Sequence, residues 1–437
     1  MTKKNLYKDY IRYLLPTIAT MVLFSTYTMI DGIFIGRGVG LHALAAVNIS
    51  MPFIASLFAI AMLISIGSSN IITHYLGLNN RKKADEFFTL TISISFAISI
   101  IISLLAYLNV DILADLLGST EDIKHLVIDY LSIIILFSTF FIMTYIFEIM
   151  VKADGNPHLA IIYMIISALT NIVLDYVFIF VFDYGVKGAA IATGIAQTLP
   201  CIGYMIHFNS SKSILNLKKF NIKIKDLLNI LKFGVPTALT ELSTGFIILL
   251  FNNTLSDTYG DSGIATFSVI AYLLSLVVNT MLAINQSAQP LISYNNASGN
   301  KENVQKLKKY MMSTILLMSI LIFIFIQIFA KNIFDVFISD YDEEFINFSI
   351  RALRIFSFAF LIIGYNTGIG GYLTAIKVEN SELIISLLRG YIAIGLSIYI
   401  IPMIFGRESI WYILIVSEFI TLIFSLILFN NRVGLNK

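Results

Sequence analysis

Two aspartates, Asp31 and Asp175, stand inside long apolar stretches of the chain. A carboxylate in membrane hydrocarbon costs at least about 2.5 kcal/mol on insertion scales, so it normally faces protein or a water-filled cavity and has a task. Two carboxylates close together repel each other unless one holds a proton or a cation lies between them. These residues therefore predict a site that binds H+ or a hard cation such as Na+.

The elements that carry these aspartates are predicted membrane spans. Of the 437 residues, 57% are hydrophobic and 13% are charged, and the mean hydropathy is +0.85. A water-soluble domain could not carry this composition without a very large exposed apolar surface. A spanning helix needs about 20 mainly apolar residues. We predict an all-α polytopic membrane protein with twelve spans, near residues 11–36, 44–76, 87–110, 126–151, 158–182, 188–208, 228–256, 264–290, 308–330, 345–376, 383–404 and 410–430.

Charged residues predict the orientation of the chain. Lys and Arg gather in alternate loops on one side, and only a few lie on the other, namely Arg37, Lys124, Lys187, Lys331 and Arg407. Because basic loops stay in the cytoplasm, we expect both termini there and the protein in the plasma (inner) membrane. The first apolar stretch lacks a small-residue cleavage site, so we expect no removable signal peptide.

The sequence repeats itself without a gap after 220 residues. Matching residues recur at that offset: Pro16 as Pro236, Gly40 as Gly260, and Asn80 as Asn300. We predict an N-lobe at 1–212, a cytoplasmic linker at 213–226 and a C-lobe at 227–437, which form two pseudo-symmetric six-helix lobes. Since six spans is an even number, the halves share one orientation, and two such lobes can rock to give alternating access.

Linked motifs follow one another through nearly the whole chain. They are Met29-Ile-Asp-Gly-Ile-Phe-Ile-Gly36, Ala153-Asp-Gly-Asn-Pro157, Asn171-Ile-Val-Leu-Asp175, Gly185-Val-Lys-Gly-Ala-Ala-Ile-Ala-Thr193, and Gln289-Pro290 with Tyr294-Asn295. In order and spacing this series resembles the multidrug and toxic compound extrusion (MATE) family.

The resemblance implies a twelve-helix antiporter, not an enzyme, that exports cationic or amphipathic drugs while Na+ or H+ flows inward. We expect a monomer in the lipid bilayer, with no cofactor besides the coupling ion and no nucleic-acid partner. The pattern is most similar to the DinF-type branch, whose first lobe carries the coupling-ion residues. The matching positions are Tyr27, Asp31, Asn171, Asp175 and Thr193, and a Na+ ion would use the last four.

Depth along the helices is consistent with this site. At 1.5 Å per residue, Asp31, Asp175 and Thr193 lie roughly 8, 10 and 9 Å below the outer face of the membrane. Asn171 and Tyr27 each lie one turn deeper, on the same helix faces as Asp175 and Asp31. We therefore expect the five side chains to converge on one small pocket; the alternative is that Asp31 and Asp175 only form hydrogen bonds with neighbouring helices.

Other polar residues in the spans have less defined roles. Pro16 could act as a hinge in the helix that carries Asp31, or could form a static kink. Glu241 could attract a cationic substrate to the C-lobe side of the cleft, or could serve helix packing. Glu148, Arg389 and Glu418 are interpreted as structural. The NorM-type branch relies on an aspartate in the tenth helix, and the corresponding segment 361–366 has no acid.

Other functions fit the sequence less well. The chain has no Gly-x-x-x-x-Gly-Lys loop, so its energy is expected to come from an ion gradient. A flippase for lipid-linked saccharides of the same superfamily would share the two lobes but would need a cationic cavity, whereas Arg389 is nearly alone at mid-membrane. An intramembrane enzyme or a sensor would need a nucleophile and a base, or a soluble domain, and the loops are too short for one.

Overall fold

The computed structural model describes residues 6–219, 224–297, 299–339, 341–376, 378 and 381–434. Across these residues the chain forms helices and connecting turns, without strands. The first half contains α1 (Leu6–Gly38), α2 (Leu41–Gly77), α3 (Arg81–Leu108), α4 (Val110–Leu116), α5 (Lys124–Ala153), α6 (Pro157–Asp175), the π-helix η1 (Tyr176–Val181) and α7 (Gly185–Phe208). The rest contains α8 (Ile224–Ala297), α9 (Lys301–Phe337), α10 (Glu343–Phe356), α11 (Phe358–Ala375), α12 (Ser381–Leu387), the π-helix η2 (Leu388–Ala393), α13 (Ile394–Phe405), the 3-10 helix η3 (Arg407–Tyr412) and α14 (Ile413–Gly434).

Ten segments of the described residues are long and apolar enough to cross a membrane. One of them, Glu241–Gln289, has 49 residues and is interrupted at Gly260, where φ is 58°. This segment therefore covers parts of two predicted spans. α1, with 33 residues, is about 50 Å long and exceeds the roughly 30 Å of hydrocarbon. The prediction of an all-α polytopic membrane protein is confirmed.

The sequence repeat is visible in the backbone geometry. Gly40 and Gly260, at equivalent positions, both have positive φ values, 118° and 58°, a conformation that glycine adopts without steric strain. Asn80 and Asn300 cap the first turns of α3 and α9, each accepting a hydrogen bond from the backbone N–H three residues on. The two halves thus use the same residues to end and begin corresponding helices.

Contacts divide the chain into two compact units that differ from the sequence halves. The central unit comprises Phe34–Ser256, and the terminal unit comprises the residues up to Ile33 and from Asp257 on. In the terminal unit, the Tyr10 hydroxyl of α1 donates to Thr314 Oγ1 of α9 at 3.1 Å. The lobe boundary predicted at 213–226 marks the sequence repeat. By contacts, however, most of α1 groups with the second half of the chain, and the first part of α8 groups with the first half.

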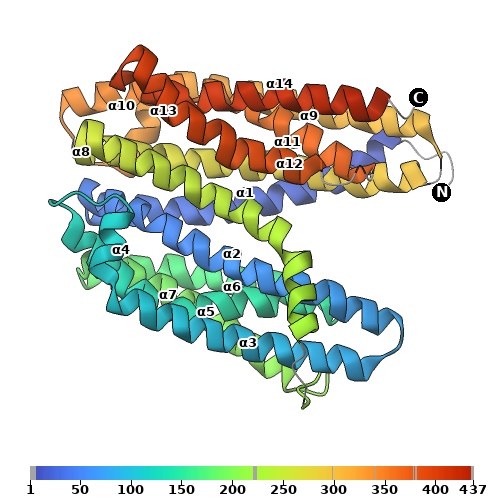
Figure 1. Ribbon diagram of the computed structural model, residues 1–437. Coiled ribbons are helices and arrows are strands. Elements are labelled where there is room, and N and C mark those ends of the chain that lie inside the picture. The colour runs from blue at the N-terminus through green and yellow to red at the C-terminus, as the bar shows by residue number, and fades with distance from the viewer. Residues whose placement is uncertain are drawn as a thin grey trace. The chain divides into compact units, whose positions relative to one another are not determined.

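α5 is the central helix of the central unit and contacts α2, α3, α6 and α7 (Figure 1). The first part of α8 crosses α2 at backbone contact. A Cβ atom on Gly67 would lie 2.0 Å from the Ile230 carbonyl oxygen, and one on Gly234 would lie 1.8 Å from that of Leu63. Small residues permit such close helix approach in membranes, and these two glycines join α8 to the central unit.

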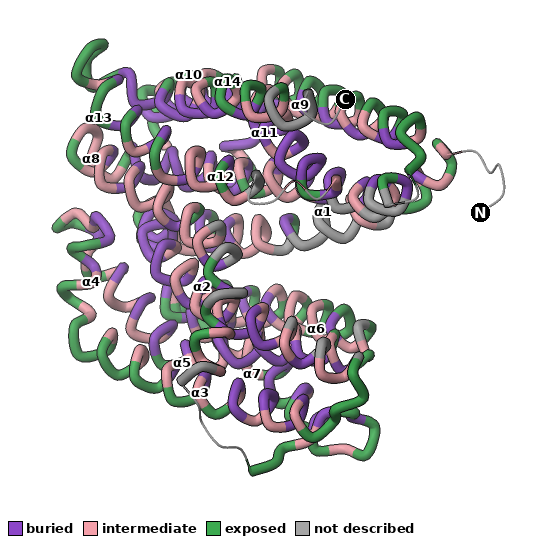
Figure 2. The backbone as a smooth tube through the Cα atoms, turned by 45° about the vertical axis from the view of Figure 1, so that its right-hand side comes forward, coloured by how far each residue is buried: buried purple, intermediate pink, exposed green. Residues whose placement is uncertain are grey.

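In the terminal unit α11 packs against α9 and α14 (Figure 1). Half of the apolar window of segment Glu343–Ala375, which includes α11, is buried, but only 17% of that of α9. Figure 2 accordingly shows long exposed stretches on α9 and buried positions on α11. Exposed apolar side chains on a spanning helix are compatible with lipid contact, so α9 is a peripheral helix and α11 a core helix of this unit.

Candidate functional site

The central unit brings together two of the predicted ion-binding residues. Asn171 on α6 donates from Nδ2 to Thr193 Oγ1 on α7 at 3.3 Å. Asp175 lies one turn further along α6 and has no exposed surface, while Asn171 is 4% exposed. Asp175 precedes the end of its span at Val181 by six residues, or about 9 Å, close to the depth expected from the sequence.

The backbone around Asp175 departs from a regular α-helix. α6 ends at Asp175, and the chain continues as the π-helix η1. Short π-helical segments are frequent at functional sites. α7 can lie close to η1 because residue 188 is glycine: a Cβ atom there would lie 3.0 Å from Phe178 Cβ. The Asp175 carboxylate is therefore placed by a local irregularity between α6 and η1 and by a close helix contact.

The chemistry of this group is that of a hard-ion or proton site. Asp175, Asn171 and Thr193 present carboxylate, amide and hydroxyl oxygens, which Na+ accepts as ligands. A carboxyl group can also take up and release a proton, which makes it compatible with H+ coupling. The three residues are compatible with either ion.

The remaining predicted ion-site residues belong to α1, in the terminal unit. Asp31 is partly buried, and its neighbour Gly32 meets α8, where a Cβ atom would lie 2.5 Å from the Tyr272 ring. The side chains of Tyr27 and Pro16 lie outside the described residues, although α1 is continuous through both positions. Convergence of all five residues on one pocket stays a prediction, as does a hinge at Pro16.

Glu241, the predicted substrate residue, is part of the central unit, because its segment of α8 packs there. Its carboxylate is within electrostatic range of the Tyr145 hydroxyl on α5. The Tyr145 ring lies 5.5 Å from the Phe58 ring of α2, centroid to centroid. An acid near an aromatic residue that packs on a second ring is a combination that attracts organic cations. The sequence assigned Glu241 to the C-lobe side, whereas its contacts are with helices of the first half.

The terminal unit contains a buried ion pair of its own. Arg389 Nε of η2 donates to Glu418 Oε1 of α14 at 2.5 Å, with 22% and 1% of the respective side chains exposed. Asn366 Nδ2 of α11 donates to Glu418 Oε2 at 2.8 Å and to its carbonyl oxygen at 2.9 Å. The segment 361–366 has no acid itself, yet it contacts one through Asn366. This network joins three helices, consistent with the structural role expected for Arg389 and Glu418.

Removal of one member of this ion pair should destabilise the protein strongly. Either Glu418→Leu or Arg389→Leu would leave an uncompensated buried charge, an effect of about 3 to 5 kcal/mol. The double variant removes both charges and should recover at least half of that loss. Thermal unfolding of the four proteins in detergent measures this coupling, and additive losses in the double variant would contradict it.

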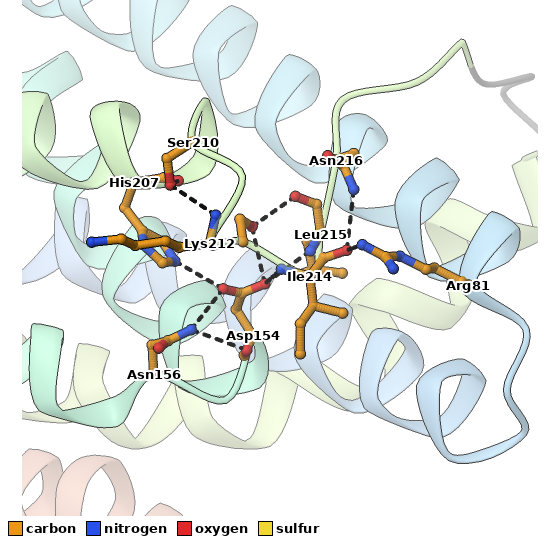
Figure 3. Close-up of polar contacts among 10 residues, drawn as sticks. Arg81, Asp154, Asn156, His207, Ser210, Lys212, Ile214, Leu215 and Asn216 are labelled. Atoms are coloured by element: carbon orange, nitrogen blue, oxygen red, sulfur yellow. Dashed lines mark hydrogen bonds and ion pairs between the residues drawn. The ribbon is translucent and has the colours of Figure 1, made fainter.

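Another buried carboxylate, Asp154, lies in the turn between α5 and α6, where it is the centre of a polar network (Figure 3). Its Oδ1 accepts from the backbone N–H groups of Ile214 at 2.7 Å and Leu215 at 2.8 Å and from Ser213 Oγ at 3.0 Å. Its Oδ2 lies 2.8 Å from His207 Nε2. Asp154 has no exposed surface. It therefore holds residues 209–219, here called the strap, against the end of the central unit.

The strap has further anchors on α3. Asp85, also without exposed surface, accepts from the backbone N–H of Asn216 at 2.9 Å and pairs with Lys218 Nζ at 3.2 Å. Arg81 donates to the Ile214 carbonyl oxygen at 2.6 Å. Sequence reasoning missed these roles. The motif 153–157 contains Asp154, but nothing in the sequence indicates partners 53 to 61 residues away.

In comparison with known proteins, one family model matches both halves of the sequence repeat. The family model MatE matches residues 16–177 and 236–399, two stretches that begin 220 residues apart. "Multidrug export protein MepA" of Staphylococcus aureus (strain bovine RF122 / ET3-1) is 25% identical over 421 residues, covering 95% of this chain and 92% of that protein. The protein of the same name from Staphylococcus saprophyticus is 23% identical over 440 residues, covering 100% and 96%.

Solved structures of similar fold cover nearly the whole chain. An inward-facing multidrug resistance MATE family transporter of the MOP superfamily superposes with a TM-score of 0.87 at 19% identity, covering 96% of this chain and 98% of that one. An outward-facing structure from the same family and superfamily gives 0.75 at 20% identity, covering 99% and 97%. At these identities the likeness concerns the fold alone, which is the predicted arrangement of twelve helices in two pseudo-symmetric lobes.

Proposed function

Since the chain belongs to the MATE family, we propose that it is a secondary active antiporter that exports cationic or amphipathic drugs in exchange for Na+ or H+. The observation that carries this proposal is the fully buried Asp175 carboxylate inside a span, one turn from the Asn171–Thr193 contact. A carboxylate in this setting is expensive to keep charged and is expected to have a transport task. The multidrug export proteins with similar sequences support the same class of activity.

In the proposed mechanism an inward-moving ion binds at Asp175, Asn171 and Thr193, and Asp31 and Tyr27 of α1 complete the site. This use of first-half residues corresponds to the DinF-type branch, which we propose for this chain. Binding of one Na+ or H+ cancels one negative charge of the site, so the loaded and unloaded forms differ in charge inside the membrane. Such a difference can bias a two-state alternating-access equilibrium, and a bend of α1 at Pro16 is the proposed coupling element.

For the substrate we propose a site that includes Glu241, Tyr145 and Phe58. A carboxylate supplies charge attraction for an organic cation, and the two rings supply cation–π and stacking contact. The rings lie on α5 and α2 and the acid on α8, so a flat amphipathic cation could contact all three helices. This set favours cationic drugs over anionic compounds.

We propose, in addition, where the protein acts and how it is oriented. The chain would act in the plasma membrane as a monomer, with both termini in the cytoplasm and no cofactor besides the coupling ion. Inversion of this orientation would reverse the direction of transport, so orientation is part of the functional proposal and can be tested with it.

The test is transport into inverted vesicles that carry the wild-type protein. A fluorescent organic cation is added outside, and a Na+ or H+ gradient is imposed in the direction that drives antiport. Accumulation with one gradient, abolished by its collapse, is the expected result and identifies the ion. Failure with several organic cations under both gradients would overturn the proposal, and movement of a lipid-linked saccharide instead would favour the flippase.

A further inference from the structure

The strap at residues 209–219 crosses the ends of three spans of the central unit. It follows directly on α7, is bonded to Asp154 at the turn between α5 and α6, and continues along α3, where Lys218 N–H donates to Thr89 Oγ1 at 2.8 Å. These anchors fix the strap at one end of the unit, and Figure 3 shows those made by Asp154 and Arg81.

The strap lies at the level of the lipid headgroups. α3 has 28 residues and is about 42 Å long, which exceeds the roughly 30 Å hydrocarbon core by about 12 Å. The strap contacts α3 at Arg81, Asp85 and Thr89, and the separation of eight positions between the first and the last of these corresponds to about 12 Å of helix. All charged residues of α3 lie within residues 81–86, so we assign the excess length to this end, where the strap lies beside it in the interfacial zone.

The apolar side chains of the strap alternate between the protein and the exterior. Leu215 has no exposed surface, whereas Ile214 is 44% exposed and Leu217 is 54% exposed. The side chains of Lys212 and Lys219 are exposed as well. Exposed aliphatic residues among lysines are the pattern of a segment that lies in a membrane interface, with its apolar groups at the acyl boundary.

Most acids near this surface are engaged by neighbouring groups, and a further one, Asp226, lies within electrostatic range of Lys83, so the exposed lysines set the charge of the surface. Asp85 and Asp154 are fully buried and accept hydrogen bonds from the strap. Glu86 pairs with Lys83 at 2.6 Å. Exposed Lys82 at the start of α3, together with Lys212 and Lys219, remains directed to the exterior without an acidic partner among the described ion pairs.

We propose that this surface is a docking site for an anionic phospholipid. Lys82, Lys212 and Lys219 would contact the phosphate and glycerol headgroup, while Ile214 and Leu217 contact the upper part of the acyl chains. The two buried aspartates are positioning residues, since they hold the strap in the interfacial zone. Basic residues at a membrane surface attract anionic lipids, and the strap adds an apolar contact that a soluble phosphate cannot use.

The test is lipid titration of the full-length protein in detergent, followed by native mass spectrometry with phosphatidylglycerol and phosphatidylcholine. Each lysine near an anionic lipid contributes about a five-fold change in affinity. The variant Lys82→Gln/Lys212→Gln/Lys219→Gln should therefore lose at least about ten-fold in phosphatidylglycerol binding and little in phosphatidylcholine binding. The control Lys301→Gln/Lys309→Gln/Lys331→Gln removes the same charge from exposed positions of the terminal unit and should retain wild-type binding.

Three outcomes would overturn the proposal, and a fourth would remove its apolar part. Wild-type lipid affinity in the strap variant would exclude the site, and equal losses in both triple variants would mean a general charge effect. Glycerol phosphate distinguishes a lipid site from a phosphate site: competition at the concentrations at which phosphatidylglycerol binds would contradict a lipid site. Ile214→Ser/Leu217→Ser, with the lysines intact, should weaken lipid binding, and unchanged binding would remove the apolar part of the proposal. Thermal unfolding midpoints of all variants establish that they are folded.

Discussion

Asp175→Asn is expected to reduce gradient-driven drug transport at least about 100-fold, in vesicles that contain as much folded protein as the wild type. The amide has nearly the same shape as the carboxylate but cannot take up a proton or neutralise a cation. Loss of a binding contribution of about 3 kcal/mol corresponds to this factor at 1.4 kcal/mol per ten-fold change. The measurement is initial uptake of the fluorescent cation under the gradient that drives the wild type.

A matched control lies eight residues further on. Asp183 is exposed and has a φ of 53°, a conformation that asparagine tolerates well. Asp183→Asn therefore makes the same chemical change outside the buried site and should transport at the wild-type rate. Asp31→Asn should resemble Asp175→Asn if α1 completes the site. Full transport by Asp175→Asn would remove the proposed ion site while leaving the exporter proposal open.

The sequence predicted the spans and the repeat because both depend on local pattern. Apolar windows define where helices can cross hydrocarbon, and the turn glycines at positions 40 and 260 adopt the positive φ values that their place between apolar runs suggests. The proximity of Asn171 and Thr193 could also be predicted, because the helical rise gives the depth of each residue in the membrane and the two spans follow each other in the sequence.

Contacts between distant segments were beyond sequence reasoning. The repeat indicated two lobes, but repeat offset gives no information on which helices touch, and α1 and the start of α8 were assigned to the lobes of their own halves. Their contacts depend on particular close approaches, such as Gly234 against Leu63. Glu241 was placed on the C-lobe side for the same reason. The Arg389–Glu418 pair likewise depends on which helix faces are opposed in the folded unit.

Asp154→Ala is expected to release the strap from the central unit. The substitution removes the acceptor of the Ile214 and Leu215 N–H groups and the carboxylate partner of His207. Loss of one member of a buried charged network typically destabilises by about 3 to 5 kcal/mol. If the strap opens locally, its open population rises more than about 100-fold, and cleavage in the open state follows that population. Trypsin should then cut at Lys212, Lys218 and Lys219 far faster than in the wild type.

Glu148→Ala provides the control on the same helix. Glu148 pairs with Lys152 at 2.6 Å, but 45% of the lysine side chain is exposed, and exposed pairs contribute about 0 to 1 kcal/mol. Tryptic cleavage of the strap in this variant should match the wild type. Equal cleavage of Asp154→Ala and wild type would mean that other anchors, chiefly Asp85, hold the strap alone. Combining Asp154→Ala with Asp85→Ala would then separate the two contributions, because both carboxylates bind neighbouring residues of one strap.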